Sequence, residues 1–242
     1  RIEGRIVGDD DALEEPRPQL SWAWDDLGYT TGAIFGALNL AENRTIATVA
    51  AGLTAGAPAA VTLESRAEAR TIVNRVVTGP AGSPSLVWPE QRPGETALTI
   101  AGSLPLGAQP FQLGISIGNP TLWFASVLRK RLIEEGIIVT GDAVDIDDLT
   151  PPPDRSDAMM LFTYRSPTLA EIAQPLLKES INLYAEAFMR LNSDKSAFPT
   201  NDAALEGLRK RLTAWGVPEG SYQLVDGSGL SHRRSRGRGS HV

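Results

Sequence analysis

The chain has 242 residues, of which 42% are hydrophobic and 21% are charged, and it contains no cysteine. This composition is typical of a folded soluble protein that buries a sizeable core. The lack of cysteine excludes disulfides, a thiol nucleophile and a cysteine-ligated zinc site. The only histidines, His232 and His241, lie in the last eleven residues, which excludes histidine catalysis from the body of the fold. No motif indicates a metal or a cofactor.

The net charge of −6 is unevenly distributed along the chain. The last eleven residues hold four of the 23 basic side chains, which leaves 19 basic against 29 acidic side chains in residues 1–231. A body with a net charge of −10 argues against nucleic-acid binding. No apolar run approaches the roughly 20 residues that a transmembrane segment needs. The first residue is Arg1, and no signal peptide is recognisable.

The first 150 residues are rich in predicted strands. Asp9–Asp11 is predicted to form a solvated acidic turn, since three adjacent carboxylates point in divergent directions and make poor metal ligands. Loop signals rich in glycine and proline occupy 79–84 and 89–94. Runs of β-branched and apolar residues predict strands over 1–7, 45–50, 59–63, 71–78, 96–101, 111–117, 137–139 and 143–146.

Predicted helices dominate the second part of the chain. Asn119, Pro120 and Gly136 are typical start and stop residues, and they predict a helix over 120–135. Pro151–Pro153 marks the clearest boundary, after which Ser166 and Pro167 are expected to open a helix that Pro175 kinks or closes. Further elements are predicted as helices over 181–191 and 202–215 and a strand over 221–225.

Ser180 and Asn182 form the first candidate constellation, between two predicted helices. A hydroxyl there can relay a proton, and a carboxamide can donate to and accept from a substrate amide at once. The tripeptide alone is weak evidence, because a serine that caps the second helix is the favoured explanation of it.

The second constellation is a short glycine-rich stretch after the predicted strand 221–225. It is readily interpreted as a tight turn in which both glycines adopt positive φ and the aspartate binds the backbone. It lacks the Lys-Ser/Thr ending of a phosphate loop and the first glycine of a nucleophile elbow. Its residues are Asp226, Gly227, Ser228, Gly229, Leu230 and Ser231.

Together the two constellations resemble the class C low-molecular-mass penicillin-binding proteins. These are D-alanyl-D-alanine carboxypeptidases/endopeptidases related to the serine β-lactamases. The shared patterns are Lys-x-Ser-x-Asn-x-Tyr-Ala-Glu over 178–186 and Asp-Gly-Ser-Gly-Leu-Ser over 226–231. The resemblance covers roughly residues 1–231 and extends to Ile2–Asp10, Trp22–Leu27, Ala37–Asn39, Glu42-Asn43, Ile100–Pro105 and Leu132–Gly141.

The resemblance implies acyl transfer at a cleft formed by three motifs. Ser-x-x-Lys would supply a serine nucleophile and its lysine base, and Lys-Thr/Ser-Gly would anchor the terminal carboxylate of the substrate. Ser180 would relay a proton to the leaving D-alanine, Asn182 would bind the peptide amide, and residues 226–229 would be structural neighbours of the site. Implied partners are peptidoglycan stem peptides and, for the full-length enzyme, β-lactam antibiotics. The enzyme would be exported.

Two of the three motifs are missing from the chain. None of its four lysines lies three residues after a serine, and none precedes Thr-Gly or Ser-Gly. This pattern favours a chain cut at both ends over one mutated at two sites. The lysines are Lys130, Lys178, Lys195 and Lys210.

The resemblance implies an α/β (α+β) fold, a partial serine β-lactamase/transpeptidase-like domain with inserted, mostly β domains. Residues 1–160 would be inserted domains, and 161–231 a partial catalytic domain. The basic tail 232–242 departs from the family, which indicates a reading-frame shift or a disordered basic arm. We expect a serine-type carboxypeptidase that is inactive as this fragment. The alternative is a non-catalytic cell-wall-binding or scaffolding module.

Overall fold

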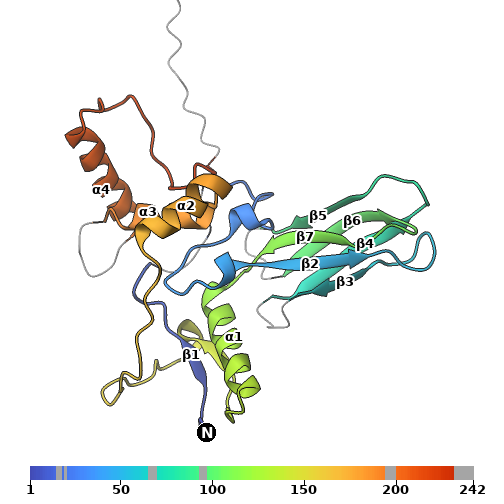
Figure 1. Cartoon of the computed structure of the whole chain (residues 1–242), viewed down its shortest axis with the longest axis horizontal. Helices are drawn as coiled ribbons and strands as arrows, with labels where there is room; N and C mark the ends of the chain where they lie inside the picture. The colour runs from blue at the N-terminus through green and yellow to red at the C-terminus, as the bar shows by residue number, and fades with distance from the viewer. Residues whose placement is uncertain (15–17, 19–20, 65–69, 93–96, 194–199, 232–242) are drawn as a thin grey trace, which may run out of the picture.

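The computed structural model describes residues 1–14, 18, 21–64, 70–92, 97–193 and 200–231, so the predicted basic tail 232–242 lies outside the described residues. Figure 1 shows a β-rich part followed by a group of helices. The mixture confirms the predicted α/β (α+β) class.

The strands are β1 (Ile6–Gly8), β2 (Arg44–Ala50), β3 (Ala60–Leu63), β4 (Ile72–Gly79), β5 (Leu86–Glu90), β6 (Leu98–Pro105), β7 (Phe111–Ser116) and β8 (Ala143–Asp145). The helices are α1 (Pro120–Glu134), α2 (Leu169–Glu179), α3 (Asn182–Arg190) and α4 (Asn201–Ala214), with 3-10 turns η1 (Thr30–Gly32), η2 (Ala41–Asn43) and η3 (Ile146–Asp148).

Two three-stranded sheets enclose the main apolar core (Figure 1). One is antiparallel with the order β3-β2-β7, and the other has the order β4-β6-β5, with β4 parallel and β5 antiparallel to β6. Burial alternates along β2, as expected for a strand with one face in a core. The buried core side chains are Ala47, Val49, Ala59, Val76, Leu98, Ile100, Leu104, Leu113 and Ile115.

No strand was predicted over β5, because Pro89 lies within it and glycine- and proline-rich segments surround it. Among the described residues β5 pairs with β6 alone, and it is one of the two edge strands of its sheet. Proline cannot donate a ladder hydrogen bond, and an edge position tolerates it for that reason. The strand exists because tertiary pairing outweighs the local signals.

The helix α1 confirms the prediction for 120–135, with Asn119 as its cap. The Asn119 side chain accepts from the backbone N of Leu122 at 2.8 Å, and Pro120 occupies the first helical position. The helix packs against the parallel pair β1 and β8 (Figure 1). The predicted strands over 1–7 and 137–139 are shorter than expected: β1 covers Ile6–Gly8, and Val139 forms only an isolated bridge to Ile2.

The segment from Pro151 to Pro167 contains neither helix nor strand, as expected for a stretch that starts with three prolines. Its side chains are exposed, including a run of large apolar residues from Met159 to Phe162. Among the helices in the described part of the chain, none is long and apolar enough to cross a membrane.

The start of α2 differs from the prediction. Thr168, not Ser166, is the cap, because its hydroxyl and the Glu171 carboxylate form a reciprocal capping box. Pro175 lies inside α2 and does not end it. Proline removes one backbone donor, and that loss is tolerated here in a solvent-exposed helix of 11 residues.

The other helices agree with their predictions to within a residue or two. Thr200 caps α4 by accepting from the backbone N of Ala203 at 3.1 Å. A small apolar cluster joins α3 to α4 through Met189, Ala204 and Leu205. The strand predicted over 221–225 is wrong: those residues are turn or irregular, and Leu224 packs on that cluster and pairs with no strand.

Candidate active site at the junction of α2 and α3

Ser180 lies at the turn between α2 and α3. It adopts a left-handed conformation with φ 56° and ψ 47°, and it is the C-cap residue at which α2 ends. The cap residue of α3 is Ile181, which makes no side-chain cap bond. The alternative interpretation of Ser180 as a helix N-cap is therefore wrong. Its hydroxyl lies on an exposed corner.

Asn182 is half-buried at the first position of α3, and its carboxamide is held from one side. Its Nδ2 donates to the carbonyl oxygen of Thr31 at 2.9 Å. That contact uses one of the two N–H hydrogens; among the described residues nothing else bonds to the carboxamide, so a second N–H and the oxygen are left for other partners. The side chain is thus oriented and still has the donor and the acceptor that a peptide amide needs.

Glu186 links α3 to the glycine-rich turn. Only 2% of this residue is exposed. Its Oε1 accepts from the backbone N of Gly227 at 3.1 Å and of Ser228 at 2.9 Å. Burial raises the pKa of the Glu186 carboxyl, with the bonds from Ser228 and Gly227 acting in the opposite direction and the charge of Asp226 adding to the increase. Glu186, the last residue of the 178–186 pattern, therefore joins that pattern to the glycine-rich turn.

Gly227 differs from the expected role of a turn glycine. Its φ is not positive; a Cβ there would lie 2.5 Å from the carbonyl oxygen of Ala185 and 2.9 Å from the Cβ of Met189. Glycine is needed because the turn lies directly on α3. Gly229 does adopt the predicted positive φ, at 75°.

Asp226 is the centre of the turn, as the sequence analysis expected. Its Oδ1 accepts from the backbone N of Gly229 at 2.8 Å, and its Oδ2 accepts from the backbone N of Ser231 at 2.9 Å. The Ser231 hydroxyl also donates to Oδ2, and the indole Nε1 of Trp22 donates to it at 3.0 Å. The turn is thereby bound to a segment some 200 residues earlier.

The contacts of Trp22, Thr31 and Glu186 could not be found from the sequence. Trp22 and Glu186 belong to segments that carry the family resemblance, but nothing in the sequence pairs them with their partners. Lys178 lies in the last turn of α2, two residues before Ser180. Lys130 lies on α1, where its Nζ is 3.7 Å from Glu134. Lys195 falls outside the described residues.

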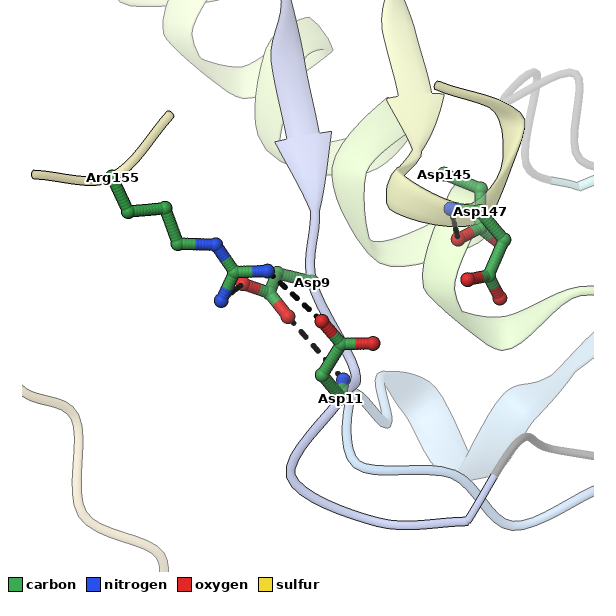
Figure 2. A network of polar contacts seen from close by, with 5 residues as sticks. All are labelled: Asp9, Asp11, Asp145, Asp147 and Arg155. Carbon is green, nitrogen blue, oxygen red and sulfur yellow. Dashed lines mark hydrogen bonds and ion pairs between the residues drawn. The ribbon is translucent and has the colours of Figure 1, made fainter. Parts of the chain in front are cut away.

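The acidic turn Asp9–Asp11 is only partly the solvated turn that was predicted. Figure 2 shows Arg155 between Asp9 and Asp11, with ion pairs of 2.6 and 2.9 Å. Asp10 is instead buried and accepts from the Thr121 hydroxyl. Burial raises the pKa of Asp10, opposed by the Thr121 bond. The turn folds inward because α1 supplies this donor.

Asp10, Asp145 and Asp147 are the residues whose arrangement comes nearest to a metal site in the described part of the chain. One oxygen from each lies within 4.8 Å of the others, and Figure 2 shows Asp145 and Asp147 side by side. Asn119 Nδ2 donates to Asp145 at 2.7 Å. Because the buried carboxylates have protein donors, we assign no metal here.

Comparisons with known proteins place this geometry in a family. The profile of the D-Ala-D-Ala carboxypeptidase 3 (S13) family matches residues 1–235. A D-alanyl-D-alanine carboxypeptidase from Actinomadura sp. is 29% identical over 236 residues, which are 95% of this chain and 43% of that protein. The penicillin-sensitive carboxypeptidase A of Dictyostelium discoideum is 31% identical over 140 residues, 56% of this chain and 25% of that protein.

Solved structures show the same fold. Penicillin-binding protein 4 from Haemophilus influenzae superposes with a TM-score of 0.74 at 19% identity, over 95% of this chain and 50% of that one. The same protein in complex with a β-lactam superposes with a TM-score of 0.62 at 20% identity, over 82% of this chain and 45% of that one. The chain thus spans less than half the length of the curated relatives it matches. It spans about half the length of penicillin-binding protein 4 in the superposition with the TM-score of 0.74.

Proposed function

Because this chain belongs to the D-Ala-D-Ala carboxypeptidase 3 (S13) family, we propose that it is the part of a serine-type D-Ala-D-Ala carboxypeptidase/endopeptidase that relays a proton and binds the substrate amide. Ser180 is the relay and Asn182 the binding residue. The observation that carries the proposal is the Asn182 carboxamide, held by Thr31 yet retaining one N–H and its oxygen. The substrates are peptidoglycan stem peptides.

The reaction is acyl transfer to a serine hydroxyl. A serine oxygen bonds to the carbonyl carbon of the penultimate D-alanine, and the peptide bond to the terminal residue breaks. The attacking serine loses its hydroxyl proton to the lysine base of the Ser-x-x-Lys motif, and a proton passes through the Ser180 hydroxyl on the exposed corner to the leaving amine. Water then cleaves the acyl-enzyme ester and restores the serine. Asn182 aligns the peptide amide throughout.

The proposal places the nucleophile in a part of the parent enzyme outside these 242 residues. The 242 residues contain no Ser-x-x-Lys and no Lys-Thr-Gly. The proposal is therefore that the chain by itself forms no acyl-enzyme, and that an exported parent enzyme with the missing motifs binds β-lactams. Incubation of the chain with a fluorescent penicillin tests this directly. Covalent labelling of the 242-residue polypeptide would refute it.

The role of Asn182 is tested in a parent polypeptide that includes both missing motifs. We expect Asn182→Ala to slow penicillin acylation by about 10²- to 10³-fold, the usual effect of losing a positioned hydrogen-bond donor. The cost in folding free energy should be near 1 kcal/mol, because one bond to the Thr31 carbonyl is lost.

Asn74→Ala is the matched control, since Asn74 Nδ2 also donates to a backbone carbonyl, that of Ala59, at 2.7 Å. It should destabilise β4 and leave acylation unchanged. Equal acylation rates in the Asn182→Ala variant and the wild type would disprove the assigned role.

A further inference from the structure

The first turn of α3 is held by two contacts with segments much earlier in the chain. Asn182 donates to Thr31, and the Tyr184 hydroxyl donates to Oε1 of Glu42 at 3.0 Å. The helix has only nine residues, and its N-cap residue, Ile181, makes no side-chain cap bond. An uncapped short helix has little intrinsic stability. These two contacts therefore act with the buried side chain of Leu183 to orient its first turn.

Glu42 is presented by a turn that the sequence does not favour locally. Ala41, Glu42 and Asn43 all adopt left-handed conformations, with φ of 49°, 54° and 51°. This region is unfavourable for residues with a Cβ, and three in succession are rare. Surrounding contacts must compensate for such a conformation.

Asn43 supplies that compensation. It is completely buried. Its Nδ2 donates to the carbonyl oxygen of Ile34 at 2.8 Å, and its Oδ1 accepts from the backbone N of Leu40 at 3.0 Å. Its own backbone N donates to the Leu40 carbonyl at 2.9 Å. The turn is thus fixed on its inner side, while Glu42 extends from it toward α3.

The carboxylate of Glu42 is balanced between two partners. Its Oε2 forms an ion pair of 2.5 Å with Arg44 at the start of β2, and its Oε1 accepts from Tyr184. Burial, followed by the contact with Glu42, raises the pKa of the Tyr184 hydroxyl. That hydroxyl therefore keeps its proton and donates to the carboxylate, which is the stronger, charge-assisted kind of hydrogen bond.

We propose that Glu42 is a positioning residue for Asn182: through the Tyr184 hydroxyl it fixes the first turn of α3 and so the direction of the Asn182 carboxamide. The inference rests on the proposed function, since it names what aligns the substrate-binding side chain. The proposal also means that the turn before β2, which carries Glu42, contributes to the geometry of the site. The chain retains a strained turn because that turn places a carboxylate where α3 needs an acceptor.

The experiment uses the 242-residue chain and requires no catalysis. The side-chain amide signals of Asn182 are followed by NMR, together with amide hydrogen exchange over 182–185. We expect Glu42→Ala to shift the Asn182 signals and to speed exchange about tenfold, the effect of losing a hydrogen bond to a charged group. Tyr184→Phe removes the same bond without altering the turn, and it should reproduce both changes.

Two further variants complete the design. Glu42→Gln keeps an acceptor for the Tyr184 hydroxyl and should restore the Asn182 signals to near their wild-type positions. Glu134→Ala is the matched control, since it removes a carboxylate paired with Arg131 at 2.8 Å on α1, away from α3. It should leave Asn182 unchanged.

The outcomes separate this proposal from the proposed function. If Tyr184→Phe leaves the Asn182 signals and the exchange of α3 unchanged, Glu42 does not position Asn182, whatever the enzyme does. If Glu42→Ala and Glu42→Gln disturb Asn182 equally, the effect comes from the turn and the proposal is also overturned. A penicillin assay cannot produce either result, because the readout is the geometry of Asn182 and not its activity.

Discussion

The sheets of residues 44–116 and the helices of residues 169–214 are stabilised in different ways. Between the sheets, Leu98 and Ile100 are completely buried in a core that both sheets share. In the helical part, α2 has no buried residue, and Leu177 is 82% exposed. The helices are held chiefly through side chains of α3. Glu186 binds the glycine-rich turn that follows α4, and Asn182 and Tyr184 bind the 3-10 turns η1 and η2, which precede β2. The site is therefore positioned by specific polar contacts more than by a core.

The largest expected effect on the free energy of unfolding comes from a substitution in the core between the sheets. Leu98→Ala should lower the free energy of unfolding by about 2–5 kcal/mol, because it leaves a cavity in a packed interior. Leu177→Ala is the matched control, since the same side chain is lost from an exposed position; a change within about 0.5 kcal/mol is expected. Chemical denaturation measures both. Equal losses would show that the two regions do not differ in the way described.

An intermediate effect is expected at the contact between the glycine-rich turn and α3. Gly227→Ala places a Cβ 2.5 Å from the Ala185 carbonyl oxygen, so the turn must move away from the helix. Overpacking of this kind costs about 1–3 kcal/mol, and amide exchange of α3 should rise.

Gly118→Ala is the control for that substitution, because a Cβ there meets nothing closer than 3.5 Å. It should change the free energy of unfolding only slightly. Normal exchange of α3 in the Gly227→Ala variant would show that the turn does not restrain the helix.

The smallest expected effect is the pH dependence that comes from Glu186. Its pKa is raised in the folded state by burial, so the folded protein holds the proton more tightly than the unfolded chain. The stability from this group is present below its unfolded pKa, near 4.5, and is lost as pH rises through the folded pKa.

Denaturation at several pH values, with Glu186→Gln as the comparison, measures this contribution. The variant should lack the part of the decline above pH 4.5 that Glu186 causes. Asp10, whose pKa is also raised, remains in both proteins and cancels in the difference. If the difference between the two proteins does not vary with pH, Glu186 is not the group responsible.

Much of the secondary structure followed from the sequence because its signals are local. The cap at Asn119 and the proline at position 120 act within one helix turn, and α1 appeared as predicted. Strand β5 did not follow, because Pro89 opposes it and only pairing with β6 creates it. The prediction of a strand over 221–225 was wrong for the opposite reason. Its residues have suitable local preferences, but no neighbouring strand pairs with them in the described part of the chain, and Leu224 packs on the α3–α4 cluster instead.

The candidate site shows the same division. Its motif residues, Ser180, Asn182 and Asp226, could be singled out from residue types and spacing. Their surroundings could not: Thr31, Glu42 and Trp22 lie some 140 to 200 residues from the groups they bind. A single sequence contains no signal for hydrogen bonds over such separations.

By itself the sequence determined the class of the fold, the family, the chemistry available without cysteine or body histidines, and the residues worth testing. Only the tertiary structure decided how those residues are held. It turned Ser180 from a possible cap into an exposed left-handed corner, and it made Gly227 a contact with α3. The physical reason is range: propensities and caps act within a few residues, whereas the direction of a side chain is set by whatever the folded chain brings against it.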